Sequence, residues 1–94
     1  MNRQICDAIR GRNHLTFMYK NCRCVVEPLS YGVAHSGDEI LQAFQTSPEG
    51  EFSSSWKTYR VDDIENLMLL TSRWVHRLGN QSHREPMSKT YAEA

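Results

Sequence analysis

The chain has 94 residues, and its eleven basic side chains balance its eleven acidic ones, so the formal net charge is zero. A chain of this length forms one domain and buries only about 60–65% of the surface that it exposes when unfolded. Zero net charge excludes a global field that would attract nucleic acid or an anionic membrane, so any anion site must be local. Three cysteines, no apolar leader after Met1 and no apolar run near the roughly 20 residues that cross a bilayer predict a cytoplasmic protein outside the membrane.

The first predicted element is a short helix. Ile5, Ala8 and Ile9 recur at the i, i+3, i+4 spacing of one helical face. Gly11 stands where a helix stop is expected, and the arginines on either side of it complement the negative end of the helix dipole. We therefore expect the helix to end near Arg10.

A β-hairpin is predicted after the helix. From His14 onward the sequence has the two-residue period of a half-buried strand, with one face formed by Leu15, Phe17 and Tyr19. Lys20-Asn21 fits a tight turn, and residues 22–29 give a second strand rich in β-branched side chains. Pro28 lacks a backbone N–H, so we expect it at the end of this strand or on an edge.

Three more strands are predicted. The turn residues 36–38 precede a third strand at 40–44, and residues 46–51 have the composition of a loop. A fourth strand is followed by a short turn at 62–65 and a fifth strand at 66–70. One helix and five short strands predict a mainly β, small α+β domain, built as a five-stranded partly open barrel with an N-terminal helix.

The predicted barrel domain covers residues 1–78. Trp74, Val75 and Leu78 form its last apolar patch, which we interpret either as a turn that closes one end of the barrel or as a homodimer contact. Residues 79–94 contain few apolar side chains. They predict a polar tail that is flexible or pairs with a partner.

Arg60 is the most informative residue, because it lies in a stretch that otherwise has the pattern of a half-buried strand. Tyr59 and Val61 suit the core face, so Arg60 must project from the opposite face. An arginine held by a strand is a fixed cationic fork for a carboxylate or a phosphate. The alternative is a structural ion pair with a nearby acid such as Asp62, worth about 0–1 kcal/mol.

Five other residues are candidates for the same ligand site. Tyr19, Tyr31 and His35 could line the mouth of a pocket, where aromatic rings stack against bases. The core is the stronger interpretation for Tyr19, which shares a face with apolar residues, whereas Tyr31 and His35 are better candidates for the site than for the core. Arg23 and Lys57 could widen the basic surface, although solvated charge is the simpler interpretation of both.

The pattern does not predict an enzyme, a metal or a cofactor. Cys22-Arg23-Cys24, with His14 across the hairpin, raises the question of a zinc site. Structural zinc usually takes four ligands in paired Cys-x-x-Cys motifs, so small buried cysteines are the favoured interpretation. The sequence also has no recognisable Ser/His/Asp or Cys/His arrangement and no glycine-rich phosphate loop.

Five patches follow one another between residues 5 and 70. They are Ile5-x-x-Ala8-Ile9, Leu15-Thr16-Phe17-Met18-Tyr19, Val26-Glu27-Pro28-Leu29, Gly37-x-x-Ile40-Leu41-Gln42-Ala43-Phe44 and Tyr59-Arg60-Val61-Asp62-x-Ile64-x-x-Leu67. Together they resemble the WYL domain family, and Arg60 and Tyr19 match an arginine and a tyrosine of that family. The resemblance implies an SH3-like or Sm-like barrel, a ligand-sensing module of bacterial transcription regulators that binds nucleic acid or nucleotide-like anions.

Two hypotheses follow from this resemblance. The first is a stand-alone regulatory module that binds an anionic ligand, a nucleotide or single-stranded nucleic acid, through Arg60; the excess of basic side chains in residues 1–24 favours it. The second is a protein-interaction or oligomerisation module that keeps the barrel but has lost the ligand pocket. Glu39-Ile40-Leu41 stands where the family has Trp-Tyr-Leu, and Asp63 where it often has arginine, which favours the second.

Overall fold

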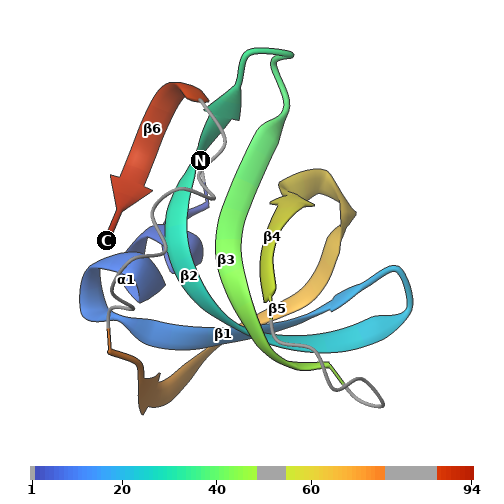
Figure 1. Cartoon of the computed structure of the whole chain (residues 1–94), viewed down its shortest axis with the longest axis vertical. Coiled ribbons are helices and arrows are strands. Elements are labelled where there is room, and N and C mark those ends of the chain that lie inside the picture. The colour runs from blue at the N-terminus through green and yellow to red at the C-terminus, as the bar shows by residue number, and fades with distance from the viewer. Residues whose placement is uncertain (1, 49–54, 76–86) are drawn as a thin grey trace.

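The computed structural model describes residues 2–48, 55–75 and 87–94. Its elements, in chain order, are α1 (Arg3–Gly11), β1 (Asn13–Tyr19), β2 (Cys22–Ala34), β3 (Glu39–Pro48), β4 (Ser55–Arg60), the 3₁₀ turn η1 (Val61–Asp63), β5 (Ile64–Arg73) and β6 (Met87–Glu93). The strands form one antiparallel sheet, and α1 packs against it (Figure 1). The predicted mainly β fold with an N-terminal helix is confirmed.

Helix α1 is capped by residues of its own sequence. The Asn2 side chain accepts a hydrogen bond from the Ile5 N–H at 3.1 Å, which satisfies one free donor of the first turn. Arg12 follows the last turn in the left-handed conformation, with φ of 56°. The buried face is the predicted one, formed by Ile5, Cys6, Ala8 and Ile9. Within the three described ranges, no helix is long and apolar enough to span a membrane.

β1 and β2 form the predicted hairpin. Tyr19 pairs with Cys22, and the two residues between them, Lys20 and Asn21, have φ of 51° and 65°. Positive φ at both central positions is the geometry of a type I′ turn, whose twist matches that of the paired strands. The turn therefore fixes the register in which Phe17 lies opposite Cys24.

The long strand β2 has two neighbours along one of its edges. β1 pairs with it as far as Val26, and β6 pairs with it from Ser30 to Ala34, while β3 follows the other edge. Of the two positions predicted for Pro28, the end of the strand is wrong, because Pro28 lies in the middle of β2, whereas the edge position agrees with the structure. Pro28 falls between the two segments, so its missing N–H lies outside the ladders with β1 and β6.

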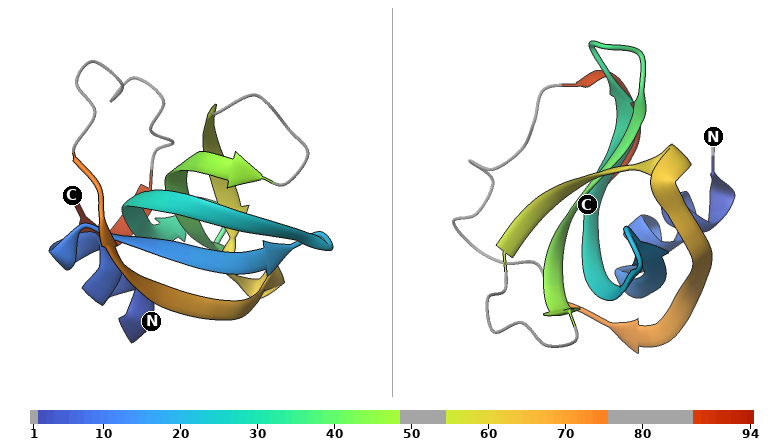
Figure 2. Two further views of the ribbon diagram at one scale, coloured as in Figure 1. Left: turned by 90° about the horizontal axis from the view of Figure 1, so that it is seen from below. Right: turned by 90° about the vertical axis from the view of Figure 1, so that its right-hand side faces the viewer.

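The sheet curls strongly but is not closed. Its strand order is β4-β3-β2-β1-β5, so β4 and β5 are the two ends of the path, and η1 connects them directly. Figure 2 shows how this curl brings the ends of the sheet round toward one another. The predicted short turn before the last barrel strand is confirmed, although it lies at Val61–Asp63 and β5 runs on to Arg73.

The curled sheet encloses an aromatic core. The Phe17 and Tyr59 ring centroids lie 5.0 Å apart in an edge-to-face contact, and Leu15 and Leu41 are fully buried beside them. Such pairs contribute about 0.5–1.5 kcal/mol beyond the area that they bury. The two-residue period of β1 therefore identified this face of the core correctly.

β6 is the main departure from the sequence-based prediction. The sheet has six strands, not five, because residues 87–93 pair with β2 in an antiparallel register that includes Tyr31 opposite Ala92. The prediction of a flexible tail over 79–94 is thus wrong for the last eight residues, and its first part, 79–86, lies outside the described residues. Backbone pairing with β2 compensates for the low apolar content of this strand.

Trp74 packs against its own domain. The residue is 6% exposed, its backbone N–H donates to the Arg12 carbonyl at 2.8 Å, and the Arg12 guanidinium lies 6.0 Å from its ring centroid. This arrangement agrees with a turn that closes one end of the sheet and leaves little ring surface for the homodimer contact considered above. Val75 is 84% exposed, and Leu78 lies outside the described residues.

Candidate ligand-binding site at Arg60

Arg60 is the last residue of β4, paired with Ile40 of β3. Its guanidinium reaches the carboxylate of Asp38 at 3.5 Å, and the two side chains are 56% and 45% exposed. Arg60 therefore projects from the sheet as predicted and makes an ion pair, but with Asp38 of the turn between β2 and β3 rather than with Asp62. An ion pair this exposed stabilises the fold by no more than about 1 kcal/mol.

Tyr19 fixes the backbone beneath Arg60. The Tyr19 hydroxyl accepts a hydrogen bond from the Arg60 N–H at 3.3 Å, and its ring lies edge-on to Tyr59 with centroids 4.9 Å apart. The Lys20 ammonium lies 5.6 Å from the centroid of the same Tyr19 ring. The partly buried Tyr19 therefore contacts the backbone of Arg60 through its hydroxyl and the Lys20 ammonium through its ring.

Carboxylates surround the hairpin side of this tyrosine. An open depression of about 400 Å³ is lined by Lys20, Asn21, Asp62, Asp63 and Glu65. Its three acids outnumber its one cation, so this side of the site repels an extended chain of phosphates. The arrangement suits an anion that contacts Arg60 from the Asp38 side.

His35 and Tyr31 lie in different environments. His35 is exposed in the turn that also carries Asp38. Tyr31 is fully buried in the core, which corrects its assignment to a pocket mouth. Its hydroxyl donates to Glu39 at 2.5 Å and accepts from the Asn2 N–H at 2.6 Å, and burial together with the Glu39 contact raises its pKa.

Arg23 and Lys57 are not gathered at Arg60. Arg23 is exposed on the β1–β2 hairpin, where its guanidinium donates to the Thr16 hydroxyl at 3.4 Å. Lys57 lies opposite Ala43, three residues along β4, which corresponds to about 10 Å of strand. The structure therefore brings Tyr19 and Arg60 together and adds Asp38 and Lys20, two residues that sequence analysis did not assign to the site.

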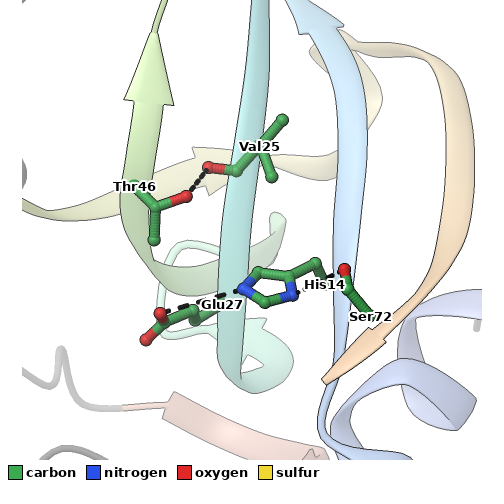
Figure 3. Close-up of polar contacts among 5 residues, drawn as sticks. All are labelled: His14, Val25, Glu27, Thr46 and Ser72. Atoms are coloured by element: carbon green, nitrogen blue, oxygen red, sulfur yellow. Dashed lines mark hydrogen bonds and ion pairs between the residues drawn. The ribbon is translucent and has the colours of Figure 1, made fainter. Parts of the chain in front are cut away.

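A separate polar group connects three strands on the outer face. The His14 ring of β1 lies between Ser72 of β5, whose hydroxyl is 3.0 Å from Nδ1, and Glu27 of β2, whose carboxylate is 3.9 Å from Nε2 (Figure 3). The second distance is too long for a hydrogen bond, so the group lacks the aligned proton path of a Ser-His-acid triad. We interpret it as a cross-strand contact.

His14 does not lie across the hairpin from Cys22 and Cys24. His14 lies opposite the Glu27 segment of β2, away from Cys22 and Cys24, and burial raises the pKa of the Cys24 thiol. Among the residues that the structure describes, no group of three or more His, Cys, Asp or Glu side chains could hold a metal ion. The arrangement offers a cationic contact and no recognisable centre for metal or thiolate chemistry in this part of the chain.

Comparison with known proteins identified no relative of this chain. No protein-family model, no curated protein and no solved structure matches this chain. The resemblance to the WYL domain family therefore rests on the five sequence patches, and any function must be argued from the geometry around Arg60.

Proposed function

We propose that this chain is a regulatory ligand-binding module of WYL type, with an SH3-like or Sm-like barrel, which binds an anionic ligand through Arg60. The strand order β4-β3-β2-β1-β5, the 3₁₀ turn between β4 and β5 and the N-terminal helix support the barrel assignment. The ligand is a nucleotide or a short single-stranded nucleic acid, and the module binds it without chemical conversion.

One observation carries the proposal. Arg60 is half exposed on a backbone held by the Tyr19 hydroxyl, and its guanidinium faces an equally exposed Asp38 carboxylate at 3.5 Å. A solvated pair of this kind exchanges its partner at little cost, because water screens the attraction. A phosphate offers more acceptor oxygens than the carboxylate and can take its place in a two-pronged contact.

The neighbouring charges define the kind of anion. Lys20 supplies a second cation near Tyr19, while Asp62, Asp63 and Glu65 oppose negative charge farther along the hairpin side. One or two phosphates can therefore be accommodated, whereas a long polyanion would meet the acidic cluster. This favours a nucleotide, or one end of a single strand, over an extended nucleic acid track.

A second candidate, a protein-interaction or oligomerisation module, is favoured by the same acids. Asp62, Asp63 and Glu65 form an exposed or partly exposed group around an open depression, with Lys20 as its one cation. A cationic loop of a partner protein would match this surface better than a phosphate would. The two candidates differ in the sign of the ligand charge, so one titration separates them.

The experiment is a fluorescence-anisotropy titration with a labelled single-stranded oligothymidylate at about 50 and 200 mM salt. For two phosphate contacts, affinity should fall about sevenfold over this range. Arg60→Ala should abolish most binding and reduce the salt dependence. The matched control is Arg73→Ala, which removes the same charge from the far end of β5, beside Asn13, and should bind normally.

Asp38→Asn provides the sharper test. It removes the carboxylate that competes for Arg60 and keeps the side-chain volume, so affinity should rise by up to about fivefold, equivalent to the 1 kcal/mol limit of an exposed ion pair. Unchanged binding in both Arg60→Ala and Asp38→Asn would remove Arg60 from the site. Absence of binding by the wild-type protein at low salt would instead support the interaction module.

A further inference from the structure

The edge of β2 from Ser30 to Ala34 is covered by a strand from the other end of the chain. β6 pairs with it antiparallel, with Gly32 opposite Thr90 and Val33 opposite Lys89, and the Ala94 N–H donates to the Leu29 carbonyl at 2.8 Å. In Figure 1, β6 lies alongside β2 and close to α1. These are main-chain contacts of the type by which a sheet accepts an added strand.

Gly32 adapts the β2 edge to a strand at very short range. A side-chain carbon at this position would clash with the Lys89 carbonyl oxygen and would lie 2.9 Å from the Thr90 Cα, and both atoms belong to the β6 backbone. Because both are backbone atoms, the clash cannot be relieved by the rotation of a side chain. The remaining close atom, the Met87 thioether sulfur, also belongs to β6. Glycine is therefore required at this position for β6 to pack against β2.

Side chains of β6 complete the core beside this edge. Ala92 is 8% exposed and belongs to the same core cluster as Ile5 and Tyr31. The Tyr91 ring packs on Tyr31 with centroids 5.1 Å apart. Without β6 on this edge, the part of the core around Tyr31 would be exposed to water. The edge therefore favours binding of a strand with a small residue at the position of Ala92.

The chain that connects β5 to β6 is long enough to leave its own domain. Trp74 stays packed on its own domain, and the twelve residues 75–86 that follow it are long enough to extend to about 40 Å, whereas the longest dimension of the protein is 33 Å. A tethered strand has an effective concentration in the millimolar range. Its own β6 therefore occupies the edge at low protein concentration, and the same strand from another molecule competes once its concentration becomes similar.

We propose that the β2 edge from Ser30 to Ala34 is a self-association surface whose partner is β6 of a second copy of this chain. In the exchanged dimer each copy supplies Tyr91 and Ala92 to the core of the other, so each contact seen within one molecule is formed between two. The strand whose fit to this edge is known is β6 itself, which makes a second copy the partner best matched to it. This inference is independent of the Arg60 site.

Two complementary variants of the full chain test the proposal. Ala92→Glu prevents a chain's own β6 from docking but leaves its β2 edge intact, because a charged side chain cannot occupy the buried position. Gly32→Ala blocks the edge but leaves β6 intact. Isotope-labelled Ala92→Glu protein should recover the wild-type amide resonances of residues 30–34 when unlabelled Gly32→Ala protein is added to about 1 mM, the effective concentration of a tethered strand.

Added Ala92→Glu protein, whose β6 cannot dock, is the matched control and should produce no recovery. If Ala92→Glu fails to fold, Thr90→Pro serves in its place, because it removes a backbone donor from the centre of β6 without adding charge. Circular dichroism establishes that each variant keeps the sheet. Resonances of residues 30–34 that stay unchanged when the Gly32→Ala protein is added to either folded variant would overturn the proposal.

Discussion

Tyr31→Phe tests whether the buried phenol is structural, as the fold indicates, rather than part of a ligand pocket. The substitution keeps the ring in contact with Tyr91 and removes the oxygen that donates to Glu39 at 2.5 Å and accepts from the Asn2 N–H at 2.6 Å. A hydrogen bond to a charged group contributes about 1.5–3 kcal/mol. Glu39 and Asn2 are both partly exposed, so water can satisfy them in part, and we expect a loss of about 2 kcal/mol.

The assay is thermal unfolding followed by circular dichroism at neutral pH. For a domain of this size, a loss of about 2 kcal/mol corresponds to a fall in Tm of about 10 °C. Tyr91→Phe is the matched control, because its hydroxyl makes no hydrogen bond within residues 2–48, 55–75 and 87–94. Equal stability of the two variants would refute the assignment of Tyr31 to a buried hydrogen-bond pair.

Four further outcomes are expected. Burial raises the pKa of Tyr59 above the usual value near 10, because the folded protein favours the neutral phenol. The stability that this phenol contributes is therefore complete below pH 10 and is lost as the pH rises further. The urea midpoint should fall above pH 10 less steeply in Tyr59→Phe than in the wild type. Leu41→Ala opens a cavity at a fully buried site and should lower the free energy of unfolding by about 2–5 kcal/mol in chemical denaturation. Asn2→Ala removes the α1 cap and should cost about 0.5–2 kcal/mol, whereas a threonine cap should restore most of it. Arg60→Ala should change stability by less than about 1 kcal/mol in the same assay, and a larger loss would show that the Asp38 pair is structural.

Local sequence patterns were sufficient to predict the elements that are formed by neighbouring residues. The spacing of Ile5, Ala8 and Ile9 predicted the buried face of α1, and Lys20-Asn21 predicted the hairpin turn. Alternation identified Phe17 as core. In each case the residues that decide the structure lie within a few positions of one another, so the pattern can be recognised without knowledge of the fold.

Distant pairing could not be predicted in this way. β6 has little apolar character, and its strand conformation depends on the edge of β2 that Gly32 leaves open. Tyr31 is buried because α1 and β6 meet over β2, which no short window of sequence reveals. The same limit applies to the candidate site: Arg60 was found from its strand pattern, but its partner Asp38 lies in a turn far away in the chain.

In the proposed binding mode, Arg60 exchanges the Asp38 carboxylate for the anion of a ligand. The most direct measurement is the Arg60 side-chain N–H resonance of the full protein during a titration with a nucleoside triphosphate. We predict a saturable shift of this resonance, with a lower half-saturation concentration in Asp38→Asn than in the wild type. Saturable binding that shifts other resonances but leaves the Arg60 side chain unchanged in both proteins would show that Arg60 does not contact the anion.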